Sequence, residues 1–438
     1  MNDFMRHKPI LTMLRRSVLG ALWILVSFAV AARADEDLHW PQWRGPLGTG
    51  ASPPPAPPVH WAEERNLRWK VAIPGRGASS PIVWGDRVYL TTAVPADSAA
   101  IGQVDTSQGQ PVVAATGVLS FRLLAIDAAT GQIAWSRTAL EAMPHEGAHA
   151  DGSWASNSPV TDGERVCAYF GSRGLHCFDL DGAPIWRRDL GDKRTRLGFG
   201  EGSSPLLTGG QLVVNWDHED DSFLVALEAA TGEERWRTPR DEATSWTTPV
   251  LVEGLILTNA AGGVRAYEPA TGALRWRYAA TPLNGIASPV ASAGLVFAVS
   301  SFEVGALLAL RTSDAGVVWR RELSTPYVST PLSMHGVLYV VKDDQGVIYG
   351  VDAATGEFHY GPQRLPGVRG LYASPVGADG RVYLAGRRGT TAVIRARPYF
   401  ELLAVNTLDE GFVASPALAG DAIYLRGERY LYCLAEAR

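Results

Sequence analysis

The sequence has few charged residues and no concentration of them. Asp, Glu, Lys and Arg make up 19% of the 438 residues, and the formal net charge is −5. The basic residues form no stripe or run of the kind that tracks a phosphate backbone. These absences argue against nucleic acid as a partner and against a charged, disordered tail.

Cysteine is also scarce. The three cysteines are Cys167, Cys177 and Cys433. Cys167 and Cys177 stand on the two expected strands of one hairpin and would face each other directly only if the turn sets that register. An export compartment permits a disulfide between them, but we favour two buried thiols, and we expect Cys433 in the core.

We find no apolar run in the sequence that is long enough for a membrane-spanning helix. The run from Val18 to Ala31 has 14 residues, whereas a span needs about 20. It follows basic residues and ends at Ala32-Arg33-Ala34, which predicts a signal peptide over residues 1–34, cleaved after Ala34, and a periplasmic or secreted protein with no membrane span after cleavage. Arg15-Arg16 resembles a twin-arginine signal, so the export route stays open.

An eleven-residue repeat is the main positive feature of the sequence. Residues 125–135 read AIDAATGQIAW, and the frame returns at residues 226–236, 266–276 and, with Tyr for Trp, 350–360. We expect each copy to join two strands, because its Thr-Gly pair is typical of a tight turn in which glycine supplies a positive φ. Degenerate copies occupy residues 179–186 and 309–319.

A Ser-Pro or Thr-Pro dipeptide recurs upstream of these copies. The eight proline positions are Pro81, Pro159, Pro205, Pro249, Pro289, Pro331, Pro375 and Pro416, and from Pro159 onward the steps are 46, 44, 40, 42, 44 and 41 residues. Such a step matches one four-stranded blade, and a proline is tolerated where a strand begins. The sequence therefore predicts an all-β, eight-bladed β-propeller, whose blades we number in the order of these dipeptides.

The repeat frame Ala-x-Asp-x-x-Thr-Gly-x-x-x-Trp, fully matched from Ala125 to Trp135, resembles the tryptophan-docking motif of the pyrroloquinoline quinone-like, or quinoprotein alcohol dehydrogenase-like, β-propellers. The run Trp40-Pro41-Gln42-Trp43-Arg44-Gly45-Pro46 followed by the repeats resembles secreted bacterial members of that family, over nearly the whole mature chain. The resemblance implies that an aromatic side chain docks each blade on the next. The candidates are Trp69, Trp135, Trp186, Trp236, Trp276, Trp319 and Tyr360.

The two ends of the propeller region complement each other. Residues 66–71, NLRWKV, echo the fourth blade strand ALRWRY at residues 273–278, while the last blade ends without such a strand. We expect the N-terminal strand to complete the C-terminal blade, which closes the ring and removes its sheet edges. This places the propeller at residues 66–438, after a strap with a proline-rich spacer at residues 35–65.

Two blades depart from the pattern. The step from Pro81 to Pro159 is 78 residues, and we assign its excess, about residues 93–120, to a loop between strands of blade one. The last strand of blade seven, residues 400–408, has neither Thr-Gly nor Trp, so its contact with blade eight must be made in another way.

Candidate binding residues lie just before each Ser/Thr-Pro, where the repeats vary most. The innermost strand of a propeller blade begins there, so these side chains should gather at one mouth of the central channel. Aromatic residues, one cation and one carboxylate suit a ligand or peptide site, although they could equally plug the channel. The set is Arg76, Trp154, Glu201, Trp246, Asn284, Tyr327, Tyr372 and Phe412.

Other chemistry has weaker support. Two loops carry metal-ligand residue types without a metal motif, and solvated turn residues explain them: His145, His149 and Asp151, then Asp217, His218 and Glu219. The Gly-x-Ser-x-Gly elbow of a hydrolase does not occur. We therefore predict no metal site and no catalytic residue.

The family resemblance implies two classes of function. One is a non-catalytic scaffold that binds a periplasmic protein or small molecule, similar to the propeller of outer membrane barrel assembly. The other is a pyrroloquinoline quinone-dependent dehydrogenase of alcohols or sugars, which would need the quinone and calcium. Those dehydrogenases place two adjacent cysteines against the quinone, and this chain has neither Cys-Cys nor a Cys-x-x-Cys-His haem motif. We favour the scaffold, as a monomer without cofactor.

Overall fold

The structure is a computed structural model that describes residues 39–52, 56–97, 101–106, 111–279, 285–300, 305–322, 328–342 and 345–437. The predicted signal peptide lies outside the described residues and stays a prediction. In the part described, no helix has the length and apolar character needed to cross a membrane.

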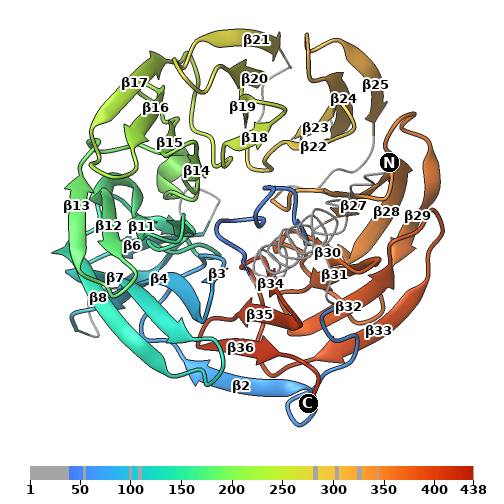
Figure 1. Ribbon diagram of the computed structural model, residues 1–438, viewed down its shortest axis with the longest axis horizontal. Helices are drawn as coiled ribbons and strands as arrows, with labels where there is room; N and C mark the ends of the chain where they lie inside the picture. Colours follow the sequence, from blue (N-terminus) through green and yellow to red (C-terminus); the bar gives the residue numbers. More distant parts are fainter. Residues whose placement is uncertain are drawn as a thin grey trace, which may run out of the picture.

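Sheets are arranged radially around a central axis, and the N-terminal segment crosses the middle of the ring (Figure 1). Among the described residues, seven sheets have four strands and an eighth has five because β1 adds to it. The prediction of an all-β propeller is confirmed, and we number these sheets as blades one to eight.

Blade one contains β3 (Ile82–Trp84), β4 (Arg87–Pro95), β7 (Leu119–Asp127) and β8 (Ile133–Ala142). Blade two contains β10 (Val160–Thr161), β11 (Arg165–Tyr169), β12 (Leu175–Asp179) and β13 (Pro184–Arg188). Blade three contains β14 (Leu206–Thr208), β15 (Gln211–Trp216), β16 (Phe223–Glu228) and β17 (Glu234–Pro239). Blade four contains β18 (Val250–Val252), β19 (Leu255–Ala260), β20 (Gly263–Tyr267) and β21 (Leu274–Ala279).

Blade five contains β22 (Val290–Ser292), β23 (Leu295–Ser300), β24 (Ala306–Arg311) and β25 (Val317–Glu322). Blade six contains β26 (Leu332–Met334), β27 (Val337–Lys342), β28 (Val347–Asp352) and β29 (Phe358–Arg364). Blade seven contains β30 (Val376–Ala378), β31 (Arg381–Ala385), β32 (Thr390–Arg395) and β33 (Leu402–Thr407). Blade eight contains β34 (Ala417–Ala419), β35 (Ala422–Arg426), β36 (Tyr430–Leu434) and the N-terminal β2 (Leu67–Ala72).

The repeated turn between the third and fourth strands forms for a local reason. In blade one the Asp127 carboxylate accepts hydrogen bonds from the Ala129 and Thr130 N–H groups at 3.2 and 2.9 Å and from the Thr130 hydroxyl at 2.8 Å. These bonds lower the pKa of Asp127 because they stabilise its charged form. Gly131 then takes a φ of 75°, which a side chain would disfavour.

β2 joins the two ends of the chain. It pairs antiparallel with β36, with Trp69 opposite Cys433. Blade eight also contacts blade one through Arg426, whose guanidinium donates to the Thr91 carbonyl at 2.6 Å and to the Ser79 hydroxyl at 2.5 Å. The N-terminal strand therefore completes the last blade, and side-chain hydrogen bonds from Arg426 join the last blade to the first.

The excess residues of blade one contain strands, which corrects the expectation of a loop. β4 continues to Pro95 and β7 begins at Leu119, and between them β5 (Ile101–Asp105) and β6 (Val112–Ala115) form a hairpin. β6 pairs with β9 (Ala148–His149) of the connection to blade two. Val113 of β6 is buried in this three-stranded sheet, whereas Val104 of β5 is exposed, and the composition of the segment did not indicate that strands would form.

Residues 39–52, the first described part of the strap, cross the ring (Figure 1, blue). Trp40 forms a bridge with Val83 of blade one, and the Pro41 carbonyl accepts from the Thr161 N–H of blade two at 2.9 Å. β1 (Ala51–Ser52) pairs parallel with β30 of blade seven. The strap therefore connects distant blades from within the ring.

The next segment fills the contact between blades seven and eight, which has no docking Trp. The Pro57 carbonyl accepts from the Tyr383 hydroxyl at 3.1 Å, and the side chain of Asn406 bonds both the Val59 carbonyl at 2.9 Å and the Trp61 N–H at 3.0 Å. Trp61 is 4% exposed and stacks on Tyr383. The chain thus supplies an indole to this contact from the N-terminal segment.

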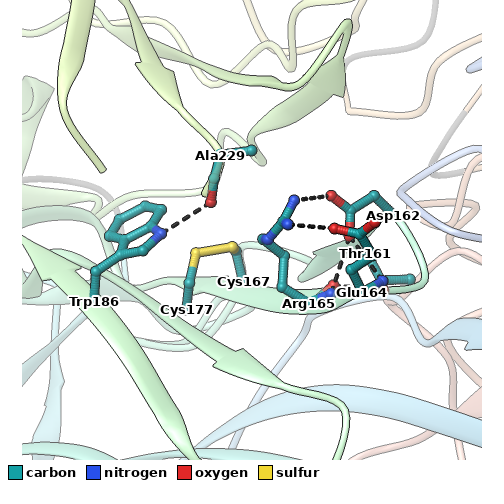
Figure 2. Close-up of a disulfide and its surroundings, with 8 residues drawn as sticks. All are labelled: Thr161, Asp162, Glu164, Arg165, Cys167, Cys177, Trp186 and Ala229. Atoms are coloured by element: carbon teal, nitrogen blue, oxygen red, sulfur yellow. Dashed lines mark hydrogen bonds and ion pairs between the residues drawn. A yellow bond between two sulfur atoms is a disulfide. The ribbon is translucent and has the colours of Figure 1, made fainter. Parts of the chain in front are cut away.

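The two hairpin cysteines form a disulfide, so the interpretation as two buried thiols is wrong. Cys167 and Cys177 are directly opposite in the β11–β12 register, with their Cα atoms 4.1 Å apart. Figure 2 shows the disulfide beside Trp186, whose indole N–H donates to the Ala229 carbonyl of blade three at 2.9 Å. Sequence alone could not decide the register, on which the bond depends. Cys433 is buried with a free thiol, as expected.

Candidate functional site at the channel mouth

The Ser and Thr residues of the Ser/Thr-Pro dipeptides form a hydrogen-bonded series around the channel. From blade one to blade seven, the backbone N–H of each member donates to the hydroxyl of its counterpart in the next blade. Seven such bonds of 2.8 to 3.0 Å occur in the described residues. We call this set the hydroxyl belt, and its members are Ser80, Ser158, Ser204, Thr248, Ser288, Thr330, Ser374 and Ser415.

All eight members of the belt line one cavity of about 440 Å³. Aromatic side chains share the wall: Trp43 from the strap, Phe199 and Trp246 from the connections beside blade three, and Tyr372 before blade seven. Phe199 and Trp246 lie 6.3 Å apart between ring centroids, and the Trp246 indole N–H donates to the Gly200 carbonyl at 2.8 Å. The cavity therefore combines a polar belt with a partly aromatic wall.

The connection between blades one and two forms part of the cavity rim. β6 and the Phe199 carbonyl hold it in place, since the His149 N–H donates to that carbonyl at 2.9 Å. Asp151 forms an ion pair with Arg387 of blade seven, and the Arg387 guanidinium lies 4.3 Å from the centre of the Tyr372 ring. An ion pair thus joins blades one and seven across the rim.

Glu201 is the second carboxylate of the cavity wall. One of its oxygens accepts from the Ser172 N–H at 2.8 Å and the Ser172 hydroxyl at 2.7 Å. The other lies 3.6 Å from the Lys193 ammonium, which is 3% exposed and stands over the Trp216 ring at 4.7 Å. The cavity is therefore supported by a buried cation behind Glu201.

A further carboxylate supports the rim from outside the cavity. Glu146 accepts hydrogen bonds from the Thr195 backbone N–H at 3.2 Å and from the Thr195 hydroxyl. Burial raises the pKa of Glu146 above its ordinary value, because the loss of hydration outweighs these bonds. Its carbonyl accepts from the Trp154 indole N–H at 2.9 Å.

The predicted mouth residues separate into different groups. Glu201, Trp246 and Tyr372 line the cavity together. Trp154 faces a smaller neighbouring pocket and packs on the core of blades one and two, and Arg76 is exposed without lining the cavity. Asn284 and Tyr327 lie outside the described residues.

Phe412 does not belong to the mouth, which corrects the prediction. It is 0% exposed and packs edge-on against Tyr432 with ring centroids 5.8 Å apart. Its backbone bridges Gly427, and this pairing turns the ring into the core of blade eight. The spacing to the proline could not show this, because residues at equal spacing take different orientations in irregular connections.

The predicted docking residues contact the following blade. Six indole N–H groups donate to a carbonyl in its turn, at 2.8 to 3.0 Å, and their residues are Trp69, Trp135, Trp186, Trp236, Trp276 and Trp319. Tyr360 differs, since its ring packs against Phe400 at 5.8 Å and its hydroxyl has no hydrogen-bond partner among the described residues.

The two loops with metal-ligand residue types do not converge. Asp217 is paired with Arg240 at 2.7 Å, with both side chains 0% exposed, and His145 lies 3.4 Å from Asp192. Within the described ranges, no group of three His, Cys, Asp or Glu side chains could hold a metal ion.

Comparison with known proteins places the chain in a family. A family model described as outer membrane protein assembly factor BamB matches residues 173–263 and 260–397, just over half of the chain. This chain belongs to the pyrroloquinoline quinone-like repeat β-propeller family. No curated protein sequence matches this member of the family.

Solved structures share the fold of this quinone-like repeat propeller. A europium-containing methanol dehydrogenase is similar with a TM-score of 0.67 and 12% identity, over 92% of this chain and 99% of that chain. A quinohemoprotein alcohol dehydrogenase from Pseudomonas putida gives 0.60 and 11%, over 93% and 82%. The enzyme from Comamonas testosteroni gives 0.58 and 13%, over 93% and 82%. At these identities the likeness shows the fold alone.

Most of the propeller's cavity wall could not be predicted from the sequence. The belt residues were visible as strand punctuation, and their regular recurrence was the available signal for a shared position. Trp43 and Phe199 carried no such signal, because they stand in irregular segments. Arg387 lies in the β31–β32 turn, and only the ring geometry brings it to Asp151.

Proposed function

We propose that this propeller is an exported, non-catalytic binding protein that takes its ligand or a partner segment in the mouth cavity. The observation that carries the proposal is the composition of the cavity wall, in which the hydroxyl belt meets Trp43, Trp246 and Tyr372. A volume of about 440 Å³ lies within the roughly 300–1,000 Å³ typical of small-molecule sites. Aromatic residues with a few convergent polar groups are the usual lining of such sites.

The acidic and basic groups at the cavity favour binding over catalysis. The Asp151 carboxylate is paired with Arg387, and the His149 Nδ1 accepts from the Asp151 N–H at 3.2 Å. Glu201 is held by Ser172 and Lys193. A general base must be free to reach a substrate proton, whereas these groups already stabilise the walls.

A quinone-dependent dehydrogenase is the second candidate, because similar structures carry that name. Calcium takes six to eight oxygen ligands. The only carboxylates that line the described part of the cavity, Glu201 and Asp151, are each paired with a cation. This donor set does not fit a calcium site, so we derive no redox step.

The test compares two tryptophans of similar burial and hydrogen bonding. Wild type, Trp246→Ala and Trp154→Ala are purified from the periplasm, and native mass spectrometry measures any retained ligand. We expect the ligand to be lost from Trp246→Ala only, because Trp154 faces away from the cavity. Equal retention in both variants would contradict the proposal.

The dehydrogenase alternative has its own assay. Wild type is incubated with pyrroloquinoline quinone and Ca²⁺, then with methanol or glucose and an artificial electron acceptor. We expect no turnover. Sustained reduction of the acceptor would establish the dehydrogenase and overturn the proposal of a non-catalytic protein.

A further inference from the structure

Arg44 of the strap is a buried cation directly behind the hydroxyl belt. It is 1% exposed, and its guanidinium donates to the carbonyls of Pro331 at 2.7 Å and Pro375 at 3.1 Å. These prolines follow Thr330 and Ser374 of the belt. Among the described residues Arg44 has no acidic partner, and its Nε has no hydrogen-bond partner.

Arg426 is a second buried cation beside the belt, at the contact between blades eight and one. It is 2% exposed and donates to the Ser79 hydroxyl at 2.5 Å. Ser79 immediately precedes Ser80 of the belt. Within the described part of the chain Arg426 likewise has carbonyl and hydroxyl partners only.

Two buried positive charges next to the belt therefore lack an acidic partner. Among the described residues, Lys193 is paired with Glu201 and Arg387 with Asp151, while Arg44 and Arg426 donate only to neutral groups and stand behind the belt rather than in the cavity lining. Burial without a counter-ion is costly for a charged group, and it lowers the pKa of Arg44 and of Arg426 to about 9. An anion in the cavity would reduce this cost.

The belt supplies hydrogen-bond donors to the same space. Seven of its hydroxyl oxygens already accept a backbone N–H, which leaves each O–H proton free to point at an acceptor. We propose that the mouth cavity binds a small organic anion, whose carboxylate oxygens accept from the belt and whose body packs against Trp43, Phe199 and Trp246. This inference rests on the proposed function and names the ligand class of that site.

Three small polar probes of different charge test the proposal by isothermal titration calorimetry at constant ionic strength. They are citrate, glucose and putrescine, titrated into the full mature chain. We expect citrate to bind with one-to-one stoichiometry and the other two not to bind. Citrate should also quench the fluorescence of Trp246. Loss of this quenching in Trp246→Ala would place the bound citrate in the cavity.

Glu201→Gln tests whether a less negative cavity wall strengthens the binding of citrate. It removes a negative charge from the wall while the Gln side chain keeps an acceptor for Ser172, so citrate should bind about 5- to 10-fold more tightly. The control is Glu357→Gln, which makes the same change in net charge at an exposed carboxylate in a blade-six turn, away from the cavity, and should have no effect on citrate binding.

Arg44→Met should weaken citrate binding at least about tenfold. Glu201→Gln keeps the test decisive if Arg44→Met does not fold.

The outcomes separate the two proposals. Binding of glucose or putrescine that Trp246→Ala abolishes, without citrate binding, would overturn the anion inference and leave the binding function standing. Weaker citrate binding by Glu201→Gln would also overturn the inference. Failure of all three probes to bind would count against both proposals.

Discussion

At the scale of single residues, the recurring indole explains how neighbouring blades attach. A Trp at a blade contact buries a large apolar ring, but it also brings an N–H that needs a partner. Trp236 is 9% exposed, donates to the Pro269 carbonyl at 2.8 Å and lies over Gly272. A Cβ at Gly272 would stand 2.3 Å from that indole. The Thr-Gly of one blade is thus paired with the Trp of the blade before it.

We predict that Trp236→Ala lowers the free energy of unfolding by about 3–5 kcal/mol, since it removes a buried ring and leaves a cavity. Trp236→Phe should cost less, because only the N–H bond and part of the ring are lost. Urea denaturation measures both. A Trp236→Ala variant with wild-type stability would show that the indole does not support the contact.

The acidic group at the contact between blades seven and eight should give stability a pH dependence. Hydrogen bonds from the Lys70 ammonium at 2.9 Å and the Tyr432 hydroxyl at 2.8 Å lower the pKa of Asp409 to about 2. Its folded pKa lies below the unfolded value near 4. The stabilisation is therefore present above about pH 4 and disappears as the pH falls toward about 2.

We expect Asp409→Asn to unfold at a lower urea concentration than wild type at pH 7, by a small margin because the group is exposed. The difference should narrow as the pH falls from about 4 to about 2, because Asp409 takes up its proton in the unfolded state at a higher pH than in the folded state. A difference that stays constant over this range would refute the assignment.

At the scale of elements, the N-terminal segment replaces what blade seven lacks. Strand β33 offers no docking Trp, and the segment around Trp61 occupies that position with hydrogen bonds to Asn406 and Tyr383. The disulfide acts at the same scale, because it ties β11 to β12 within blade two.

Replacing both cysteines, Cys167→Ala with Cys177→Ala, should lower the free energy of unfolding by roughly 2–4 kcal/mol, as expected for a short disulfide-closed loop. Denaturation is measured with and without reductant. Reductant should destabilise the wild type and leave the double variant unchanged. Equal wild-type stability in both conditions would mean that the bond contributes nothing.

At the scale of the whole molecule, each blade packs against its neighbours, and a strand from the N-terminal part of the chain completes the last blade. β36 would be an exposed sheet edge without β2, and such edges pair with other chains. A chain that begins at Ile73 should therefore aggregate or form concentration-dependent oligomers, as measured by light scattering.

The matched control for this truncation begins at Asn66 and keeps β2 while it lacks the strap. We expect it to remain monomeric but less stable than the complete mature chain. A monomeric, fully stable protein that begins at Ile73 would show that β2 does not close the blade.

The sequence by itself determined the propeller fold, the pairing of Trp69 with the last blade and the position of the belt, because all three follow from a repeat whose period equals one blade. It also pointed to Glu201, Trp246 and Tyr372. Only the tertiary structure decided the disulfide, the hairpin within blade one and the core position of Phe412, since each depends on strand register or on the path of an irregular segment. The tertiary structure also brought Arg44 and Arg426 to the belt, although they are 382 residues apart in the chain. A radial arrangement of blades makes distant residues neighbours, and no local pattern in the sequence records which ones meet.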